Sequence, residues 1–316
     1  MTDIIMTTYN GEKYIEEQIR SILDSDNDEF RLLVYDDMSS DDTPGIVKKF
    51  ADEYSGKVFF FENEIRYGHC ANFLQGLKRA KREFGADYYM FCDQDDIWLK
   101  DKIGLSLEII RELESPDADG NDAHETTPCM VFSDAMLVNT DLEPLGVTFL
   151  EADRLDAKRT DLAHLLMENK CQGCTMMFNK VLADMVDEYD ERVRYHDWWI
   201  ALIAAAFGRI GFIDTPTLMY RQHEGNVVGQ DSFAGYIKNR IKAGSADTKE
   251  RLKATRRQAA AFYKYYGRRL PQKERQVVRE FLLLPKKNAF ARRLTLIKNG
   301  YMKSGLIRNA GLMLYI

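Results

Sequence analysis

The sequence predicts an α/β fold with a mostly parallel central sheet, followed by a helical, basic C-terminal extension. Up to residue 114, short apolar runs and helix-like periodicities alternate four times, which is typical of successive βαβ units. Polar residues collect directly after these runs, at the positions where open α/β sheets bind ligands. From about residue 232 onward the pattern is wholly helical.

In the first part of the chain, each predicted strand is a short apolar run between polar turns. Each predicted helix has apolar residues three and four positions apart. Ser and Asp residues after the second strand are suited to cap the helix that follows. The predicted strands cover 3–8, 30–35, 57–61 and 88–92, and the predicted helices cover 12–23, 43–54, 71–84 and 100–114.

A polar stretch at 115–128 predicts a surface loop, and the pattern changes after it. Residues 1–231 are assigned to one domain and 232–316 to a helical C-terminal region. The later predicted strands cover 129–138, 174–178, 208–213 and 218–221; predicted helices cover 180–206 with an interruption near Tyr195, then 241–266 and 272–284, with breaks at Pro271 and Pro285.

The composition is that of a soluble globular protein, with 45% apolar and 30% charged residues. No run of about 18 apolar residues and no basic, apolar leader occur, so we expect a cytoplasmic protein. Five scattered cysteines fit reduced thiols, and the Cys171–Cys174 pair lacks the partners of a zinc site. Charge is divided unevenly: residues 1–232 hold 23 Lys+Arg and 46 Asp+Glu, whereas 233–316 hold 21 and 4.

An acidic cluster follows the predicted strand at 88–92. Asp93 and Asp95 come directly after this apolar run, and Asp96 is expected to begin the next loop and helix. Carboxylates in an Asp-x-Asp arrangement suit Mg²⁺ or Mn²⁺ bridged to phosphate oxygens. A solvated acidic turn is the alternative, and this motif alone does not decide between them.

Polar residues also follow the first three predicted strands. Tyr9 can stack on a base, and Asp36 can accept a hydrogen bond from the imide N–H of uracil or thymine. Turn chemistry explains each residue alone, but the set favours a ligand site. A dinucleotide enzyme is disfavoured, because no Gly-x-Gly-x-x-Gly follows the first strand. The set comprises Thr7, Tyr9 and Asn10, then Asp36 and Asp37, then Asn63, Arg66 and Gly68.

Two later motifs carry further candidates. Asp197 in His-Asp-Trp-Trp either caps a helix or acts as a general base, because burial beside aromatic rings raises a carboxyl pKa. After the strand at 218–221, His223 is a candidate metal ligand and Arg221 a candidate phosphate contact. A purely structural histidine remains the alternative.

Five motifs occur in order between residues 3 and 230. They are Thr7–Glu12 (TTYNGE), Val34–Asp41 (VYDDMSSD), Asn63–Phe73 (NEIRYGHCANF), Phe91–Trp98 (FCDQDDIW) and His196–Trp199 (HDWW). This ordered set resembles family 2 glycosyltransferases of GT-A fold. It is most similar to the bacterial rhamnosyltransferase-like members that assemble polysaccharides.

The resemblance implies a role for each matching position. Asp197 looks like the catalytic base, with His-Asp here in place of the Glu-Asp pair of many relatives. The implied cofactor is Mn²⁺ or Mg²⁺. The resemblance implies nucleotide and donor contacts at Thr7, Tyr9, Asn10, Asp36, Asn63, Arg66, Asp93 and Arg221, a metal site at Asp93, Asp95 and His223, and an acceptor side at Gly173, Cys174, His196 and Trp198.

The implied reaction is inverting transfer of a sugar, best assigned as L-rhamnose from dTDP-rhamnose, to a glycan or polyprenyl-linked acceptor. The alternatives are a UDP-sugar donor, such as UDP-galactose or UDP-N-acetylglucosamine, and an inactive scaffold of the same fold. The basic tail suggests either docking on the anionic inner face of the plasma membrane, or formation of a homo-oligomer or covering of the core. Nucleic-acid binding is disfavoured, because the acidic domain repels phosphate and no known module is present.

Overall fold

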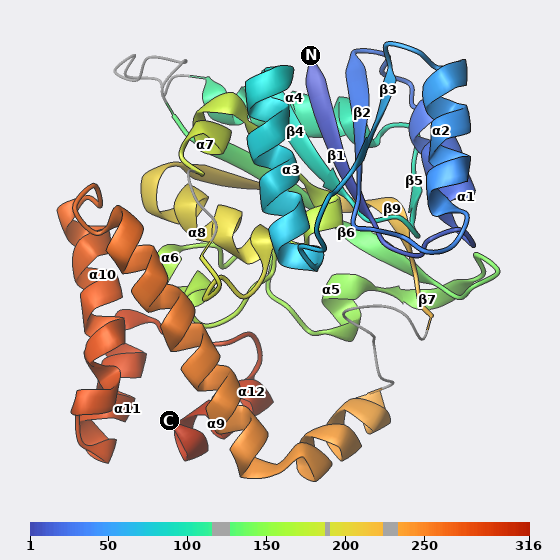
Figure 1. The fold of residues 1–316 in the computed structure, drawn as a ribbon. Helices are drawn as coiled ribbons and strands as arrows, with labels where there is room; N and C mark the ends of the chain where they lie inside the picture. Colours follow the sequence, from blue (N-terminus) through green and yellow to red (C-terminus); the bar gives the residue numbers. More distant parts are fainter. Residues whose placement is uncertain (116–126, 187–189, 224–232) are drawn as a thin grey trace.

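The computed structural model describes residues 1–115, 127–186, 190–223 and 233–316; along 233–248 it describes only the helical backbone. The described strands form one mixed sheet in the order β3-β2-β1-β4-β8-β6-β9-β5, with β7 paired to β6 (Figure 1). The strands are β1 Thr2–Thr8, β2 Phe30–Asp36, β3 Val58–Glu62, β4 Tyr88–Cys92, β5 Ile97–Trp98, β6 Cys129–Val138, β7 Pro144–Thr148, β8 Met176–Asn179 and β9 Arg209–Arg221. The helices are α1 Ile15–Leu23, α2 Thr43–Glu53, α3 His69–Glu83, α4 Lys102–Glu114, α5 Phe149–Ala152, α6 Leu162–Leu165, α7 Lys180–Asp184, α8 His196–Phe207, α9 Phe233–Tyr266, α10 Gln272–Leu283, α11 Ala289–Asn299 and α12 Leu306–Tyr315, with short 3-10 turns η1 Gly173–Thr175 and η2 Leu284–Lys286.

The first four strands form the parallel half of the sheet, as predicted. β1 pairs in parallel with β2 and β4, and β2 pairs in parallel with β3. Every residue of β1 is buried, because helices cover both faces of this half. Ile5 belongs to the core on the side of α3 and α8, whereas Ile4 and Met6 belong to the core under α1, α2 and α4. In register, Thr8 lies beside Asp36 and Met6 beside Cys92, so the carboxyl ends of these strands share one edge.

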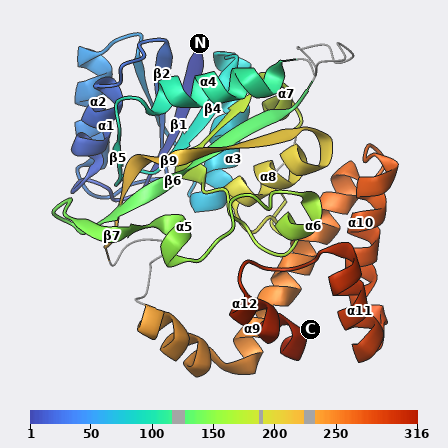
Figure 2. The same ribbon diagram turned by 180° about the vertical axis from the view of Figure 1, so that it is seen from behind.

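The second half of the sheet is mixed rather than parallel. β8 runs antiparallel to both β4 and β6, and β6 and β9 then run parallel to each other across the back of the molecule (Figure 2). The two strands predicted at 208–213 and 218–221 are one strand, β9. Its register slips between Ile213 and Pro216, because extra residues bulge out where a proline has no N–H for the ladder.

Several elements differ from the predictions in smaller ways. The strand predicted at 174–178 begins at Met176, because Gly173–Thr175 forms a 3-10 turn. The helix predicted at 180–206 is two helices, and the second begins at His196, where an interruption was expected. The sequence analysis did not predict β5, β7, α5 or α6, which are all short. Most of the loop predicted at 115–128 lies outside the described residues.

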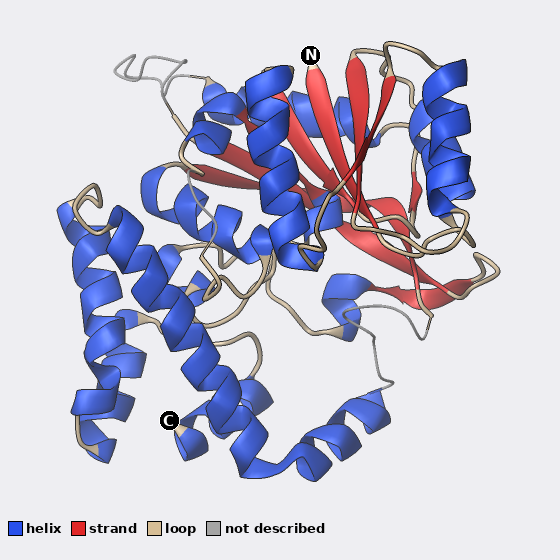
Figure 3. Cartoon of the chain, viewed as in Figure 1, coloured by secondary structure: helices blue, strands red, loops and turns tan. Residues whose placement is uncertain are grey.

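The described C-terminal region consists of helices without strands (Figure 3), as predicted. It packs on α8 through Trp199, which is fully buried and whose ring contacts Phe262, Tyr265 and Tyr266 at centroid distances of 5.7, 6.5 and 5.9 Å. These aromatic residues belong to the same core as β1 and α3, so the extension is anchored on the sheet domain. The predicted boundary at 231/232 falls on residues outside those described. No described helix is both long enough and apolar enough to cross a membrane.

Candidate active site

The candidate site lies where the parallel strands end and α8 begins. In Figure 1 the chain start, marked N, lies at the end of β1 away from the C-terminal helices, so the carboxyl ends of β1 and β4 face those helices. The residues after β4, Asp93 to Asp96, form a loop that we call the DQDD loop. Asp93, Gln94 and Asp95 are half-buried, and Asp96 is fully buried.

The DQDD loop concentrates carboxylates beside a histidine. Asp95 Oδ2 lies 2.8 Å from His223 Nε2, which brings together two of the predicted metal ligands. Burial, together with the nearby charges of Asp95 and Asp197, raises the pKa of Asp93 to about 8. A divalent cation would offset this repulsion, and oxygen and imidazole donors suit Mn²⁺ or Mg²⁺. The residues present therefore fit the implied metal.

Asp96 is part of this cluster, contrary to the sequence expectation that it only begins the next loop. Ligand atoms of Asp93, Asp96 and Cys174 lie within 4.8 Å of one another. Asp96 accepts a hydrogen bond from the Arg221 backbone N–H at 3.3 Å, while its Oδ2 has no hydrogen-bond partner among the described residues. Burial, then the charges of Asp95 and Asp93, raises its pKa well above the usual value.

A buried lysine stands behind these acids. Lys102 at the start of α4 is fully buried, donates to Thr217 Oγ1 at 3.1 Å and lies 4.8 Å from the Trp98 ring centroid. Burial lowers its pKa to about 8, against the opposing effect of Cys174, Cys92 and Asp96. Lys102 was not predicted as a site residue, because a lysine in the first turn of a helix carries no signal of burial.

The loop after β1 is tied to the DQDD loop. The side-chain amide of Gln94 accepts from the Tyr9 N–H at 2.9 Å and donates to the Tyr9 carbonyl at 3.1 Å. A Cβ on Gly11 would lie 2.3 Å from Gln94 Oε1, so a larger residue here would displace the Gln94 amide from Tyr9. Gln94 was not predicted as a site residue, because its partner lies 85 positions away.

Tyr9 is the predicted base-stacking residue, and it is 37% exposed. The Arg66 guanidinium lies 3.7 Å from the Tyr9 ring centroid, so two predicted donor contacts from different loops meet. Thr7, at the end of the same strand, is buried. Tyr9 and Arg66 therefore form an exposed part of the predicted nucleotide-binding site.

Other predicted donor residues brace the loops in this structure. Asp36 is buried and accepts from Thr8 Oγ1 at 2.8 Å and from the Ser39 N–H and hydroxyl. The Asn10 side chain accepts from the Ser40 N–H at 2.8 Å. Asn63 donates to Asp37, a buried carboxylate that also accepts two backbone N–H groups from the loop at Tyr67 and Gly68.

The Arg221 side chain is buried and makes its hydrogen bonds within the protein. Its guanidinium donates to the carbonyls of Asp95 at 3.0 Å and Thr140 at 2.6 Å and to Glu17 at 2.5 Å. The side chain is 3% exposed. These contacts tie the DQDD loop to α1 and to the turn after β6, and a phosphate contact by Arg221 stays a prediction.

Asp197, the predicted base, lies in the first turn of α8 and is half-buried. Burial raises its pKa to about 6, although hydrogen bonds from the Trp198 and Gly173 backbone N–H groups and from Asn169 oppose the rise. A Cβ on Gly173 would lie 2.6 Å from His196 Nε2, so only glycine lets this backbone approach α8. A carboxyl group with such a pKa can accept a proton near neutral pH.

Three predicted acceptor-side residues are buried, and their part in the acceptor side stays a prediction. His196 stacks on Phe73 with ring centroids 4.0 Å apart, and burial lowers its pKa well below the usual value. Trp198 donates its indole N–H to the Leu165 carbonyl at 2.6 Å. Cys174 is 2% exposed. Burial against aromatic rings keeps His196 neutral, although it is next to Asp197, the candidate base.

Comparison with known proteins agrees with this geometry. Residues 3–131 match the family described as Glycosyl transferase family 2. The dTDP-rhamnosyl transferase RfbG of Shigella flexneri is 27% identical over 237 residues, covering 71% of this chain and 73% of that protein. The UDP-Glc:alpha-D-GlcNAc-diphosphoundecaprenol beta-1,3-glucosyltransferase WfgD of Escherichia coli is 34% identical over 110 residues, but the match spans only 41% of that protein.

Solved structures show the same fold. S. aureus TarS 1–349 in complex with UDP-GlcNAc has a TM-score of 0.56 at 17% identity, covering 95% of this chain and 89% of that one. The mannosyltransferase PcManGT from Pyrobaculum calidifontis, in complex with GDP-Man and Mn²⁺, has a TM-score of 0.55 at 16% identity, covering 99% and 78%. Residues 3–131 therefore match family 2, and the whole chain has the GT-A fold of known glycosyltransferases.

Proposed function

We propose that this chain is an inverting, metal-dependent glycosyltransferase of bacterial cell-surface polysaccharide synthesis. Its donor would be a nucleoside-diphosphate sugar, in our assignment dTDP-rhamnose. The acceptor would be a glycan or polyprenyl-linked glycan at the inner face of the plasma membrane. One observation carries the proposal: a carboxylate cluster suited to a divalent cation adjoins a separate carboxyl group, Asp197, whose pKa is about 6.

The two groups of carboxylates divide the chemistry. Asp93, Asp95 and His223 would hold the cation, which when bound supplies a Lewis acid for the departing diphosphate. Asp197 takes the proton of an acceptor hydroxyl. The hydroxyl oxygen bonds to the anomeric carbon as the bond to the nucleoside diphosphate breaks, so a single displacement inverts that centre. Neighbouring carboxyl groups with separated pKa values are typical of such divided roles.

The sugar assignment draws on the relatives. RfbG is named a dTDP-rhamnosyl transferase, and its match extends over most of both chains, beyond the family 2 region. WfgD is named for UDP-Glc and a diphosphoundecaprenol acceptor, and its match covers only 35% of this chain. Because the RfbG match is the longer one, it favours a dTDP-linked rhamnose over a UDP-sugar as the donor. The lipid-linked acceptor is proposed from the name of WfgD.

The donor is tested by slow hydrolysis of nucleotide sugars, which needs no acceptor. We expect dTDP release from dTDP-rhamnose in the presence of Mn²⁺ and none with EDTA. UDP-galactose, UDP-glucose and UDP-N-acetylglucosamine are the competing donors. Turnover of a UDP-sugar in preference to dTDP-rhamnose would overturn the rhamnose assignment. Failure to bind or hydrolyse any of them, with or without acceptor extract, would instead support the inactive scaffold.

Tyr9→Ala is expected to raise the KM for the donor by between tenfold and a hundredfold, with kcat little changed. Base stacking on an aromatic ring contributes roughly 1 to 3 kcal/mol per base. Tyr9 is the exposed ring of the nucleotide side, and Arg66 holds it in place. Steady-state kinetics with Tyr9→Phe as the matched control, which keeps the ring, checks this. An unchanged KM for Tyr9→Ala would remove Tyr9 from the nucleotide site.

A further inference from the structure

The last two helices expose large apolar side chains. On α11 they recur at helical spacing, and Phe290 is 78% exposed. On α12 Leu306 is 89% exposed. The helices are neighbours, since Arg293 of α11 donates to the Met313 carbonyl of α12 at 2.8 Å. We call this set the C-terminal apolar faces, and it comprises Phe290, Leu294 and Ile297 on α11 and Leu306, Ile307 and Leu314 on α12.

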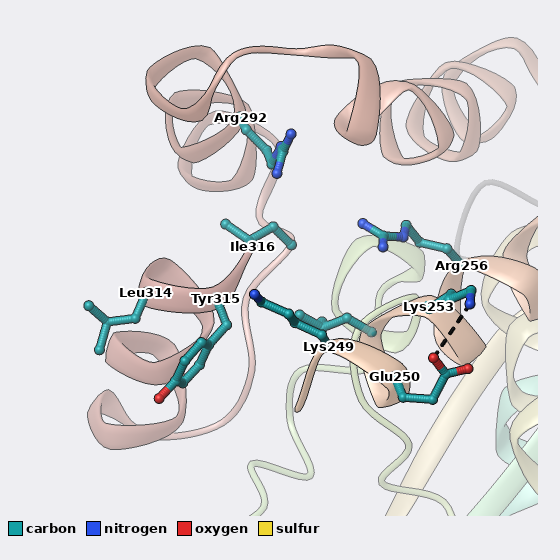
Figure 4. A pocket seen from close by; sticks show the side chains of 9 residues that line it. Lys249, Glu250, Lys253, Arg256, Arg292, Leu314, Tyr315 and Ile316 are labelled. Atoms are coloured by element: carbon teal, nitrogen blue, oxygen red, sulfur yellow. Dashed lines mark ion pairs between the residues drawn. The ribbon is translucent and has the colours of Figure 1, made fainter. Parts of the chain in front are cut away.

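A basic cavity of about 640 Å³ lies beside these faces, between α9, α11 and α12 (Figure 4). Among the described residues, its lining holds four cations, Lys249, Lys253, Arg256 and Arg292, against one carboxylate, Glu250. Figure 4 shows Arg256 and Arg292 approaching the cavity from two different helices. Burial lowers the pKa of Arg256, and the nearby charge of Arg292 lowers it further. An anion in the cavity would relieve this repulsion.

Charge decides which partner fits. Residues 249–316 hold 18 Lys+Arg and 3 Asp+Glu. A second copy packing through the same faces would bring like charges together, and this repulsion opposes association. An anionic bilayer fits both features of this surface. Its negative headgroups attract the cations, and its apolar interior accepts the exposed apolar side chains.

We propose that α11 and α12 dock the protein on an anionic membrane. The C-terminal apolar faces enter the boundary of the acyl chains, and the cavity takes the phosphate of an acidic phospholipid headgroup. The proposal deepens the proposed function and rests on it for the lipid-linked acceptor. Because α9 both lines the cavity and packs on Trp199 of α8, docking would present the helix that carries Asp197 to acceptors held at the membrane.

Vesicle flotation with the full chain tests this. We expect the protein to float with phosphatidylcholine vesicles containing 30% phosphatidylglycerol, in amounts that fall at high salt, and to remain unbound with pure phosphatidylcholine. Lys249→Glu/Lys253→Glu changes two exposed cavity cations and is expected to weaken partitioning by at least about thirty-fold. Lys78→Glu/Lys100→Glu, with the same change in net charge on the sheet domain, is the matched control and should bind like wild type.

A second pair of variants tests the apolar contribution. Phe290→Ser/Ile297→Ser should weaken partitioning by about tenfold, whereas Leu145→Ser/Val147→Ser, which removes exposed apolar groups from β7, should not. Absence of flotation, or equal binding by the cavity variant and its control, would overturn the proposal. So would a stable dimer in sedimentation that Phe290→Ser/Ile297→Ser dissociates, because a second copy would then cover these faces. Donor hydrolysis by the same samples reports the proposed function separately, since it needs no vesicle.

Discussion

Asp95→Asn is expected to lower kcat for sugar transfer by on the order of a thousandfold while the fold stays intact. Asp95 is half-buried in the DQDD loop with its Oδ2 2.8 Å from His223 Nε2, so it is placed to ligate the cation with that histidine. Loss of a metal ligand removes several kcal/mol of charge stabilisation from the leaving diphosphate. Steady-state kinetics at saturating donor would measure the loss.

The metal itself supplies a second readout of Asp95→Asn. Titration of Mn²⁺ followed by electron paramagnetic resonance should show weaker binding in this variant, together with an unchanged Tm in metal-free buffer. Asp24→Asn, which changes an exposed carboxylate after α1, is the matched control and should behave like wild type in both measurements. Full activity with wild-type Mn²⁺ affinity in Asp95→Asn would remove this residue from the metal site.

Asp197→Asn is expected to lower kcat by between a hundredfold and ten-thousandfold, the usual contribution of a general base. The amide keeps the shape of the side chain and can still accept from the Gly173 and Trp198 N–H groups. Binding of the donor should change little, because the proposed role of Asp197 is toward the acceptor hydroxyl. Asp214→Asn, an exposed position on β9, is the matched control. Retention of more than a tenth of wild-type kcat would exclude Asp197 as the base.

The pH dependence gives an independent test of the base. Burial raises the pKa of Asp197 from 3.8 to about 6, and only the ionised form can take a proton. Activity of the wild-type enzyme should therefore be full above about pH 7 and fall tenfold per pH unit below about pH 6. This acid limb should be absent from the residual activity of Asp197→Asn. A wild-type profile that stays flat down to pH 5 would contradict the assignment.

The elements of the parallel half were predictable because their signals are local. β4 occupies the predicted residues, and β1, β2, β3 and the helices between them begin and end within a few positions of the prediction. Alternating apolar runs and polar turns specify such βαβ units without reference to distant residues. The same local signals placed Asp93, Asp95 and Asp197 at strand and helix ends, which is where the structure has them.

By itself, then, the sequence determined the α/β architecture, the helical extension and the motifs that carry the chemistry. Tertiary structure alone decided the antiparallel course of β8 and the burial of Asp96 and Lys102, because both depend on contacts between segments far apart in the chain. It also decided that His196 packs on Phe73 and that Arg221 donates to the DQDD loop. The physical reason is common to all of these: burial and charge proximity set which polar groups are free to react, and neither is a property of a residue and its neighbours in sequence.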